Sequence, residues 1–248
     1  MALRATFESP GRQPVSLAFS EAADGDFAID SEAGVLGRSR QRLMAGPWTA
    51  LRQVHGDRVM IVDAPGDHLG AEGDGLVTSV PGVVVAVQSA DCVPVLFASV
   101  DGAEVVAAAH AGWRGLYEGI IERTVESMRE LGAGAIRAWI GPCISAPHYE
   151  FSEADLTTMA FRFGPEVIAA TVASRPALDV VAAARVALAG VGVDEISDEF
   201  AWCTATSTVN GEPQFASHRS RAEARRQAAA IRLGVPEATP APGDHDTA

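Results

Sequence analysis

A chain of 248 residues can bury a sizeable hydrophobic core, and its formal net charge of −13 argues against binding to nucleic acid, which needs clustered basic residues. Apolar residues make up 48% and charged residues 21%, the composition of an ordinary globular protein, and no apolar run approaches the roughly 20 residues of a membrane span. All 19 basic residues are arginine, which excludes mechanisms that depend on lysine.

Short runs of β-branched residues in the middle third of the chain predict buried strands. Three such runs follow one another closely, at Val83–Val87, Val93–Ala98 and Glu104–Ala109. The turn signal Asp101-Gly102 lies between the last two and predicts that they form a β-hairpin. A further strand is expected at Ile136–Ile140.

Four segments with apolar residues at helical spacing predict helices. The clearest is Leu116–Leu131, which carries Glu and Arg on its other face and ends before glycines. The others are Ser152–Phe163, Pro176–Ala189, which opens with a proline at a first-turn position, and Arg221–Leu233. Strands and helices alternate, but the hairpin interrupts a strict parallel order, so the pattern indicates an α/β or α+β fold.

No linker or internal repeat divides the chain, so we expect residues 1–234 to form a single catalytic domain. Residues 235–248 are rich in proline, alanine and acidic residues without apolar periodicity, and we expect this tail to be disordered. The first residues show no basic segment followed by an apolar stretch. We therefore expect a cytoplasmic protein.

Two histidines and a cysteine stand beside turns and buried strands, where functional side chains often lie. His110 ends a predicted strand and precedes Ala-Gly-Trp-Arg-Gly, whose glycines allow a ligand to approach the backbone closely. Cys92 lies between two predicted strands, and His55 lies in a strand-like segment closed by a turn. Each of the three, taken alone, has an ordinary alternative as a buried residue without chemical function.

Together these three side chains allow two kinds of site. Two histidines and a thiolate are zinc ligands, and three protein ligands leave a fourth tetrahedral position open, as in catalytic zinc sites. Alternatively, Cys92 is a nucleophile and His110 is its base. The intervals of dozens of residues do not decide between these alternatives. Three cysteines without a CxxC pair argue against a disulfide framework and a zinc finger.

Four specific motifs occur in a fixed order along the chain. They are Gln53-Val54-His55-Gly56, Ser89-Ala90-Asp91-Cys92-Val93-Pro94-Val95, His110-Ala111-Gly112-Trp113-Arg114-Gly115 and Ile140-Gly141-Pro142-Cys143-Ile144. In these motifs the chain resembles the YfiH-type family, whose members are described as laccase-domain or multicopper polyphenol oxidases, purine nucleoside phosphorylases or peptidoglycan editing factors. The similarity is clearest from Arg52 to Tyr149.

The resemblance implies a layered αββα sandwich, the fold shared by YfiH and cytotoxic necrotizing factor. It implies a zinc ion, with copper as the alternative, bound by His55, Cys92 and His110, and it favours a metal site over a cysteine nucleophile. The implied reaction is phosphorolysis of adenosine, inosine, guanosine or methylthioadenosine, with adenosine deamination as a second activity. The implied partners are a purine nucleoside and phosphate, bound by a monomer or homodimer.

Three other functions stay open. Some members of the family are described as amidases that remove misincorporated L-serine from a UDP-MurNAc precursor, and others as copper phenol oxidases. Phenol oxidation fits less well, because the sequence offers few further histidines for additional copper ions. The third is a metal-binding protein that has lost its catalytic activity.

The chain departs from the family pattern near both ends. Phe19–Gly25 lacks the arginine usual in this segment, and Ser39-Arg40 stands where Asn-Arg is usual. Ser217–Ser220 and Arg225–Gln227 replace an arginine pair and a Gly-Arg-Gln motif. We therefore expect anion recognition to be weakened or rearranged.

Arg114 is a further candidate catalytic residue, and four others are candidates for the substrate site. Arg114 could hold phosphate or polarise a substrate oxygen, with a structural ion pair as the alternative, and Arg40 and Arg219 are candidates for the same role. Asp91 could orient a metal-bound histidine or cap a turn. Cys143 could line the pocket, with simple packing as the alternative.

Overall fold

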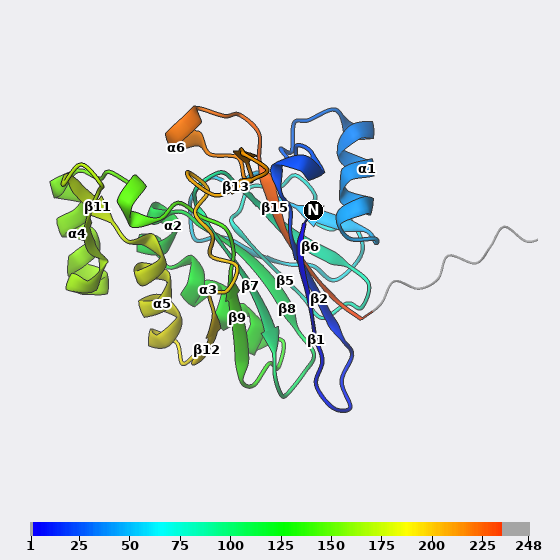
Figure 1. The fold of residues 1–248 in the computed structure, drawn as a ribbon. Helices are drawn as coiled ribbons and strands as arrows, with labels where there is room; N and C mark the ends of the chain where they lie inside the picture. Colours follow the sequence, from blue (N-terminus) through cyan, green and yellow to red (C-terminus); the bar gives the residue numbers. More distant parts are fainter. Residues whose placement is uncertain (1, 235–248) are drawn as a thin grey trace, which may run out of the picture.

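Two β-sheets stacked face to face, with helices on both outer faces, make up the fold (Figure 1). The computed structural model describes residues 2–234, so the tail expected to be disordered lies outside the described residues. The layers of helix, sheet, sheet and helix confirm the predicted αββα sandwich, a mixed α+β fold.

The central strand of the first sheet comes from the C-terminal end of the described residues. The strands of this sheet, in order, are β1 (Leu3–Phe7), β2 (Val15–Phe19), β15 (Gln227–Leu233), β6 (Val84–Ser89) and β3 (Trp48–Ala50). The central strand β15 is antiparallel to both β2 and β6, and every one of its residues is buried.

The second sheet contains the predicted hairpin at its centre. Its strands, in order, are β12 (Glu195–Ser197), β9 (Ile136–Ile140), β7 (Val93–Ser99), β8 (Val106–Ala111), β5 (Gly75–Thr78) and β4 (Val59–Ile61). Strands β7 and β8 pair antiparallel, with Val95 opposite Ala109, which confirms the hairpin. At its tip Gly102 has φ +68°, a backbone conformation that favours glycine.

Helices cover the outer faces of both sheets. Those that pack on a face are α1 (Ala33–Leu43), α2 (Trp113–Glu118), α3 (Ile120–Glu130), α4 (Glu153–Phe163) and α5 (Val180–Gly190), whereas the short α6 (His218–Arg221) buries none of its residues. Single 3-10 turns lie at Ala22–Asp24, Ala146–His148 and Pro165–Val167. Two small hairpins pair β10 (Ile168–Ala170) with β11 (Pro176–Leu178) and β13 (Thr208–Val209) with β14 (Glu212–Pro213). Within residues 2–234, no helix is long and apolar enough to span a membrane.

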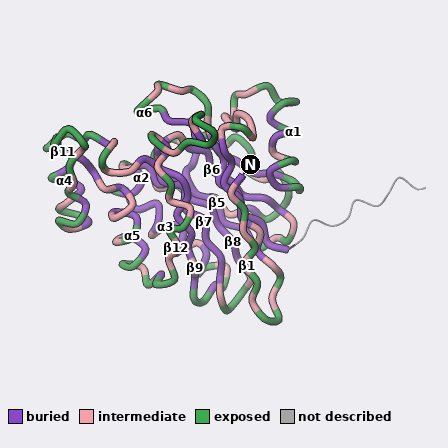
Figure 2. The backbone as a smooth tube through the Cα atoms, in the orientation of Figure 1, coloured by how far each residue is buried: buried purple, intermediate pink, exposed green. Residues whose placement is uncertain are grey.

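Three apolar layers hold these elements together, and buried residues fill the centre of the molecule (Figure 2). Strand β15 contributes to two of these layers, one on each of its faces. Its residues Ala229 and Ile231 face the second sheet, whereas Ala228 and Ala230 face α1, as the two-residue period of a strand requires. The largest layer lies between the second sheet and helices α2 to α5. Each sheet is thus buried on both faces, which explains the near-continuous apolar runs of its strands.

The predicted helix over Arg221–Leu233 is wrong. Only its first residue belongs to a helix, the short α6, and Gln227–Leu233 forms the strand β15. The alanines of this segment favour a helix in isolation, but small side chains also suit a central strand covered on both faces. The segment completes the first sheet, and tertiary packing therefore overrides local propensity.

Three other predicted segments differ in detail. The helix predicted over Leu116–Leu131 is split at Gly119, which adopts φ +109°, into α2 and α3. The segment Pro176–Leu178 is a strand, and the helix after it begins only beyond Asp179, whose carboxylate accepts the N–H of Ala182. The strand-like segment around His55 is a loop with one isolated β-bridge at Arg52.

Candidate metal centre and its cavity

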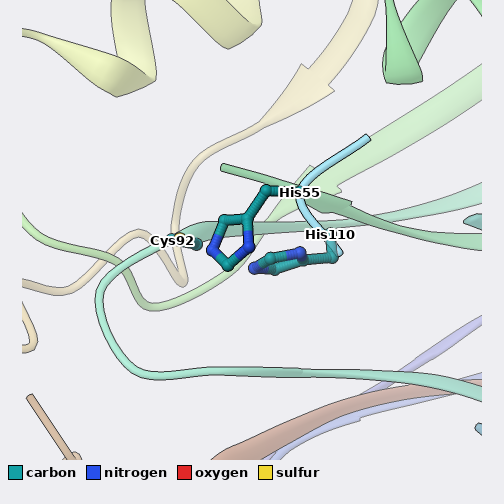
Figure 3. A group of neighbouring side chains, drawn as sticks. All are labelled: His55, Cys92 and His110. Atoms are coloured by element: carbon teal, nitrogen blue, oxygen red, sulfur yellow. The ribbon is translucent and has the colours of Figure 1, made fainter. Parts of the chain in front are cut away.

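Three side chains from distant segments meet at one end of the two sheets (Figure 3). Cys92 lies in the turn from β6 to β7, His110 lies near the end of β8, and His55 lies in the loop from β3 to β4. One ligand atom of each lies within 4.8 Å of the other two. The two imidazole rings pack edge to face, with centroids 4.9 Å apart. Two imidazoles and one thiol at this spacing form a donor set that fits zinc.

The sheet register explains why Cys92 and His110 are neighbours. In the β7–β8 hairpin Pro94 lies opposite His110 and Val93 lies opposite Ala111. Continued by one residue, this register places Cys92 opposite Gly112, two positions along from the Pro94–His110 pair, so Cys92 and His110 are diagonal neighbours on one face. Any chain with this hairpin and these residue types at its open end brings the thiol and the imidazole together.

Gly112, directly after β8, leaves room for the group. A Cβ atom on Gly112 would lie 2.9 Å from His55 Cδ2 and 3.2 Å from Cys92 Sγ. We expect Gly112→Ala to displace His55 and to weaken zinc binding at least about tenfold, because a ligand shifted by a fraction of an ångström no longer fits the metal. A competition titration with a chromophoric chelator measures the effect.

The matched control is Gly190→Ala near the end of α5, where an added Cβ would meet no atom within 4 Å. This variant should bind zinc as the wild type does. Equal affinities for the two alanine variants would show that the group tolerates a side chain at Gly112.

His110 has a hydrogen-bond partner, Asp74, that was not among the predicted site residues. Its Nδ1 lies 2.8 Å from Oδ1 of Asp74, a fully buried carboxylate directly before β5. An ionised carboxylate only accepts hydrogen bonds, so Nδ1 donates its proton to Asp74, and Nε2 is the ring nitrogen that can bind a metal ion once it has lost its own proton. The signal in the sequence was an acidic residue between two glycines, directly before an apolar strand.

The electrostatics of the group favour a thiolate. Burial alone would raise the pKa of Cys92, but the positive charge and hydrogen bond of His110, with a smaller contribution from His55, outweigh burial and lower it. Burial would lower the pKa of His110, yet the negative Cys92 and the hydrogen bond to Asp74 raise it. A thiolate is the form of cysteine that binds metal ions.

All three side chains line an open cavity of about 710 Å³. Its lining contains more basic than acidic residues, although the chain as a whole carries a net charge of −13. The arginines are Arg52, Arg114, Arg219 and Arg226, and the acidic residues are Asp30 and Asp91. A concave wall enriched in guanidinium groups favours an anionic ligand.

Two of these arginines stack on aromatic rings in the cavity wall. The Arg114 guanidinium lies 4.7 Å from the centroid of Trp113, and within residues 2–234 it makes no hydrogen bond or ion pair. Arg219 lies 5.0 Å from the centroid of Tyr149 and donates one hydrogen bond to the Glu150 carbonyl. Both guanidinium groups therefore keep donors available for an anion.

Asp91 lines the cavity but does not orient a histidine. Its carboxylate accepts hydrogen bonds from the Thr204 hydroxyl and from the backbone N–H of Arg219, both at 2.6 Å. These two bonds hold the turn before Cys92, where Asp91 itself has φ +95°. The orienting role considered for Asp91 is thus taken by Asp74.

Two other predicted site residues do not line this cavity. Arg40 lies on α1 with its guanidinium 5.7 Å from the Trp48 ring, and burial lowers its pKa. Cys143 is buried in the apolar layer under the helices, where burial raises its pKa, and it forms an isolated β-bridge with Cys203. Cys143 therefore has a packing role, which was the alternative considered for it, and does not line the pocket.

The profile of the family described as multi-copper polyphenol oxidoreductase laccase matches residues 22–234. The chain belongs to this family. A relative from Mycobacterium tuberculosis, named purine nucleoside phosphorylase Rv2149c, is 36% identical over 217 residues, which are 84% of this chain and 82% of that protein. This laccase-type family is the one that the motifs around His55, Cys92 and His110 suggested.

Solved structures share the fold of this family member. Protein NMB0706 of Neisseria meningitidis superposes with a TM-score of 0.76 at 25% identity, over 94% of this chain and 99% of that one. YfiH of Bacillus licheniformis superposes with a TM-score of 0.72 at 23% identity, over 92% and 98%. These likenesses show that the chain has the fold of these two structures.

Proposed function

We propose that this laccase-family chain is a zinc-dependent purine nucleoside phosphorylase. In this reaction the bond between C1′ of the ribose and N9 of the purine breaks, a bond from C1′ to a phosphate oxygen forms, and the base leaves with a proton. Adenosine, inosine, guanosine and methylthioadenosine are the proposed substrates, with deamination of adenosine to inosine and ammonia as a second reaction. Relatives that carry the name purine nucleoside phosphorylase support this proposal.

One observation carries the proposal furthest: a possible metal-binding group and four arginines line the same cavity of an acidic chain. Phosphorolysis needs an anion binding site beside the reacting sugar. Arg114 and Arg219 supply charged donors for phosphate. The aromatic rings of Trp113 and Tyr149, which also line the cavity, offer apolar surface for a purine.

His55, Cys92 and His110 are the proposed zinc ligands. When bound, zinc supplies Lewis-acid activation of an oxygen nucleophile near neutral pH. His110 keeps its proton on Nδ1 against Asp74, and Cys92 is held as a thiolate by the neighbouring histidines. The role of the arginines is to hold the anion in one orientation, which lowers the entropic cost of the reaction.

Copper chemistry, which the family description names, is less well supported by the donor set. Among the described residues, His55, Cys92 and His110 form the single group of three or more potential ligands close enough to share a metal. Multielectron oxidation of phenols by oxygen calls for several copper ions with further histidines. We therefore propose one zinc ion.

The test is release of purine base from adenosine and inosine by protein of known zinc content. We expect adenine and hypoxanthine to appear only when phosphate is present, and ammonia from adenosine to appear with water alone. Chelation should stop both reactions and added zinc should restore them. Zinc-loaded protein that releases neither base nor ammonia would contradict the proposal, and turnover of an L-serine-containing muropeptide precursor would then identify an amidase.

A further inference from the structure

The fully buried carboxylate of Asp74 contacts the segments of both histidines in the group. Its Oδ1 accepts the backbone N–H of His55 at 3.0 Å and lies 2.8 Å from His110 Nδ1. Its Oδ2 accepts the N–H groups of Val54 at 3.1 Å and Gly56 at 2.9 Å. We infer that Asp74 is the positioning residue that holds both histidines in a ligand geometry before any metal binds, an inference that rests on the proposed metal site.

The loop that carries His55 depends on this carboxylate. His55 adopts φ +64°, the left-handed region that residues other than glycine rarely occupy. Three successive backbone N–H groups, from Val54 to Gly56, converge on the two oxygens of Asp74. Such a concave row of N–H groups binds an anion. The negative charge therefore stabilises the unusual backbone that directs the His55 ring toward Cys92 and His110.

The main chain ties Asp74 to His110 as well. Gly75 pairs with Ala109 in the β5–β8 ladder, and the N–H of His110 donates to the carbonyl of Asp74 at 2.7 Å. Asp74 is thus fixed by the sheet to one histidine and by its side chain to both. One residue couples two ligands that are 55 positions apart in the chain.

The charge state of Asp74 agrees with this role. Its two oxygens face four N–H groups, those of the Val54, His55 and Gly56 backbone and the ring N–H of His110. The ionised carboxylate has no proton to donate. It therefore matches four surrounding N–H donors without conflict.

Asparagine at this position would preserve size but not the pattern of acceptors. If the amide oxygen faces His110 and His55, the NH2 group faces the N–H groups of Val54 and Gly56. Two donors then face each other without an acceptor, and the loop that carries His55 moves away. If the amide is turned, its NH2 group faces His110 Nδ1, and the ring proton must move to Nε2, where it blocks the ligand atom. In both orientations one of the two histidines is lost as a ligand.

The experiment compares Asp74→Asn with wild-type protein in a competition titration with zinc as the probe. We expect zinc affinity to fall about 10- to 100-fold, the range for partners that orient metal ligands. The matched control is Asp67→Asn, because Asp67 also accepts two backbone N–H groups, those of Asp63 and Ala64, but does not line the cavity. An affinity within twofold of the wild type for Asp74→Asn would overturn the inference.

Nuclear magnetic resonance of the metal-free wild type gives a second readout that does not depend on folding of the variant or on activity. We expect a slowly exchanging Nδ1 proton on His110 and protected amides at residues 54–56. Exchange of these protons at the rate of an open loop would overturn the inference. If the wild type binds no zinc while these protons stay protected, the proposed metal site fails, whereas the positioning of both histidines by Asp74 stands.

Discussion

Replacing Cys92 with alanine is expected to lower the proposed phosphate-dependent release of purine base at least about a thousandfold. The thiolate is the only anionic donor among the three proposed ligands, so two imidazoles alone would hold zinc weakly. Loss of the metal removes several kcal/mol of stabilisation of the transition state, and about 1.4 kcal/mol corresponds to a factor of ten in rate. The measurement is kcat/KM for inosine at saturating phosphate, with zinc content determined on the same sample.

Cys203→Ala is the matched control, because it makes the same chemical change outside the cavity. Cys203 is half-buried and accepts a hydrogen bond from the Ser145 hydroxyl at 3.0 Å. Its replacement should leave zinc content and kcat/KM within about twofold of the wild type, because Cys203 is neither a proposed ligand nor part of the cavity lining. Equal activities of the two alanine variants would rule out Cys92 as an essential ligand.

Replacing Phe97 with alanine is expected to reduce the free energy of unfolding by about 3–5 kcal/mol. Phe97 lies in the middle of β7, is fully buried, and belongs to the apolar layer between the second sheet and the helices. Its register partners Ala107 and Ala138 are too small to fill the space that the ring leaves. Urea unfolding followed by tryptophan fluorescence measures the loss.

Phe161→Ala provides the comparison for this stability effect. Phe161 lies on α4 with 92% of its surface exposed, so removal of its ring leaves no cavity. We expect a change within about 0.5 kcal/mol for this variant. A similar small change for Phe97→Ala would mean that the layer beneath the helices collapses readily around the missing ring.

Local sequence patterns predicted the elements whose signals are strong and short-range. Strand β9 occupies the predicted residues, and α4 begins after Ser152, whose hydroxyl accepts the N–H of Asp155. The β7–β8 hairpin follows from a turn signal between two apolar runs. In each case the information lies within about a dozen residues, because turns, caps and alternation act between neighbours in the chain.

Long-range packing decided the rest of the fold. The segment Gln227–Leu233 is alanine-rich and locally compatible with a helix, but it becomes the central strand of the first sheet because β2 and β6 supply its hydrogen bonds. Partners so distant in the chain leave no periodic trace in the segment itself.

For the site, the sequence by itself determined the residue types that gather at the end of the sheets. The motifs around His55, Cys92 and His110 mark them, and the family match agrees. Only the tertiary structure revealed Asp74 as the partner of His110 and Arg40 as a residue away from the cavity. The physical reason is that a metal-binding residue can be recognised from its side-chain chemistry. A hydrogen-bond partner, by contrast, depends on which strands and loops the fold brings into contact.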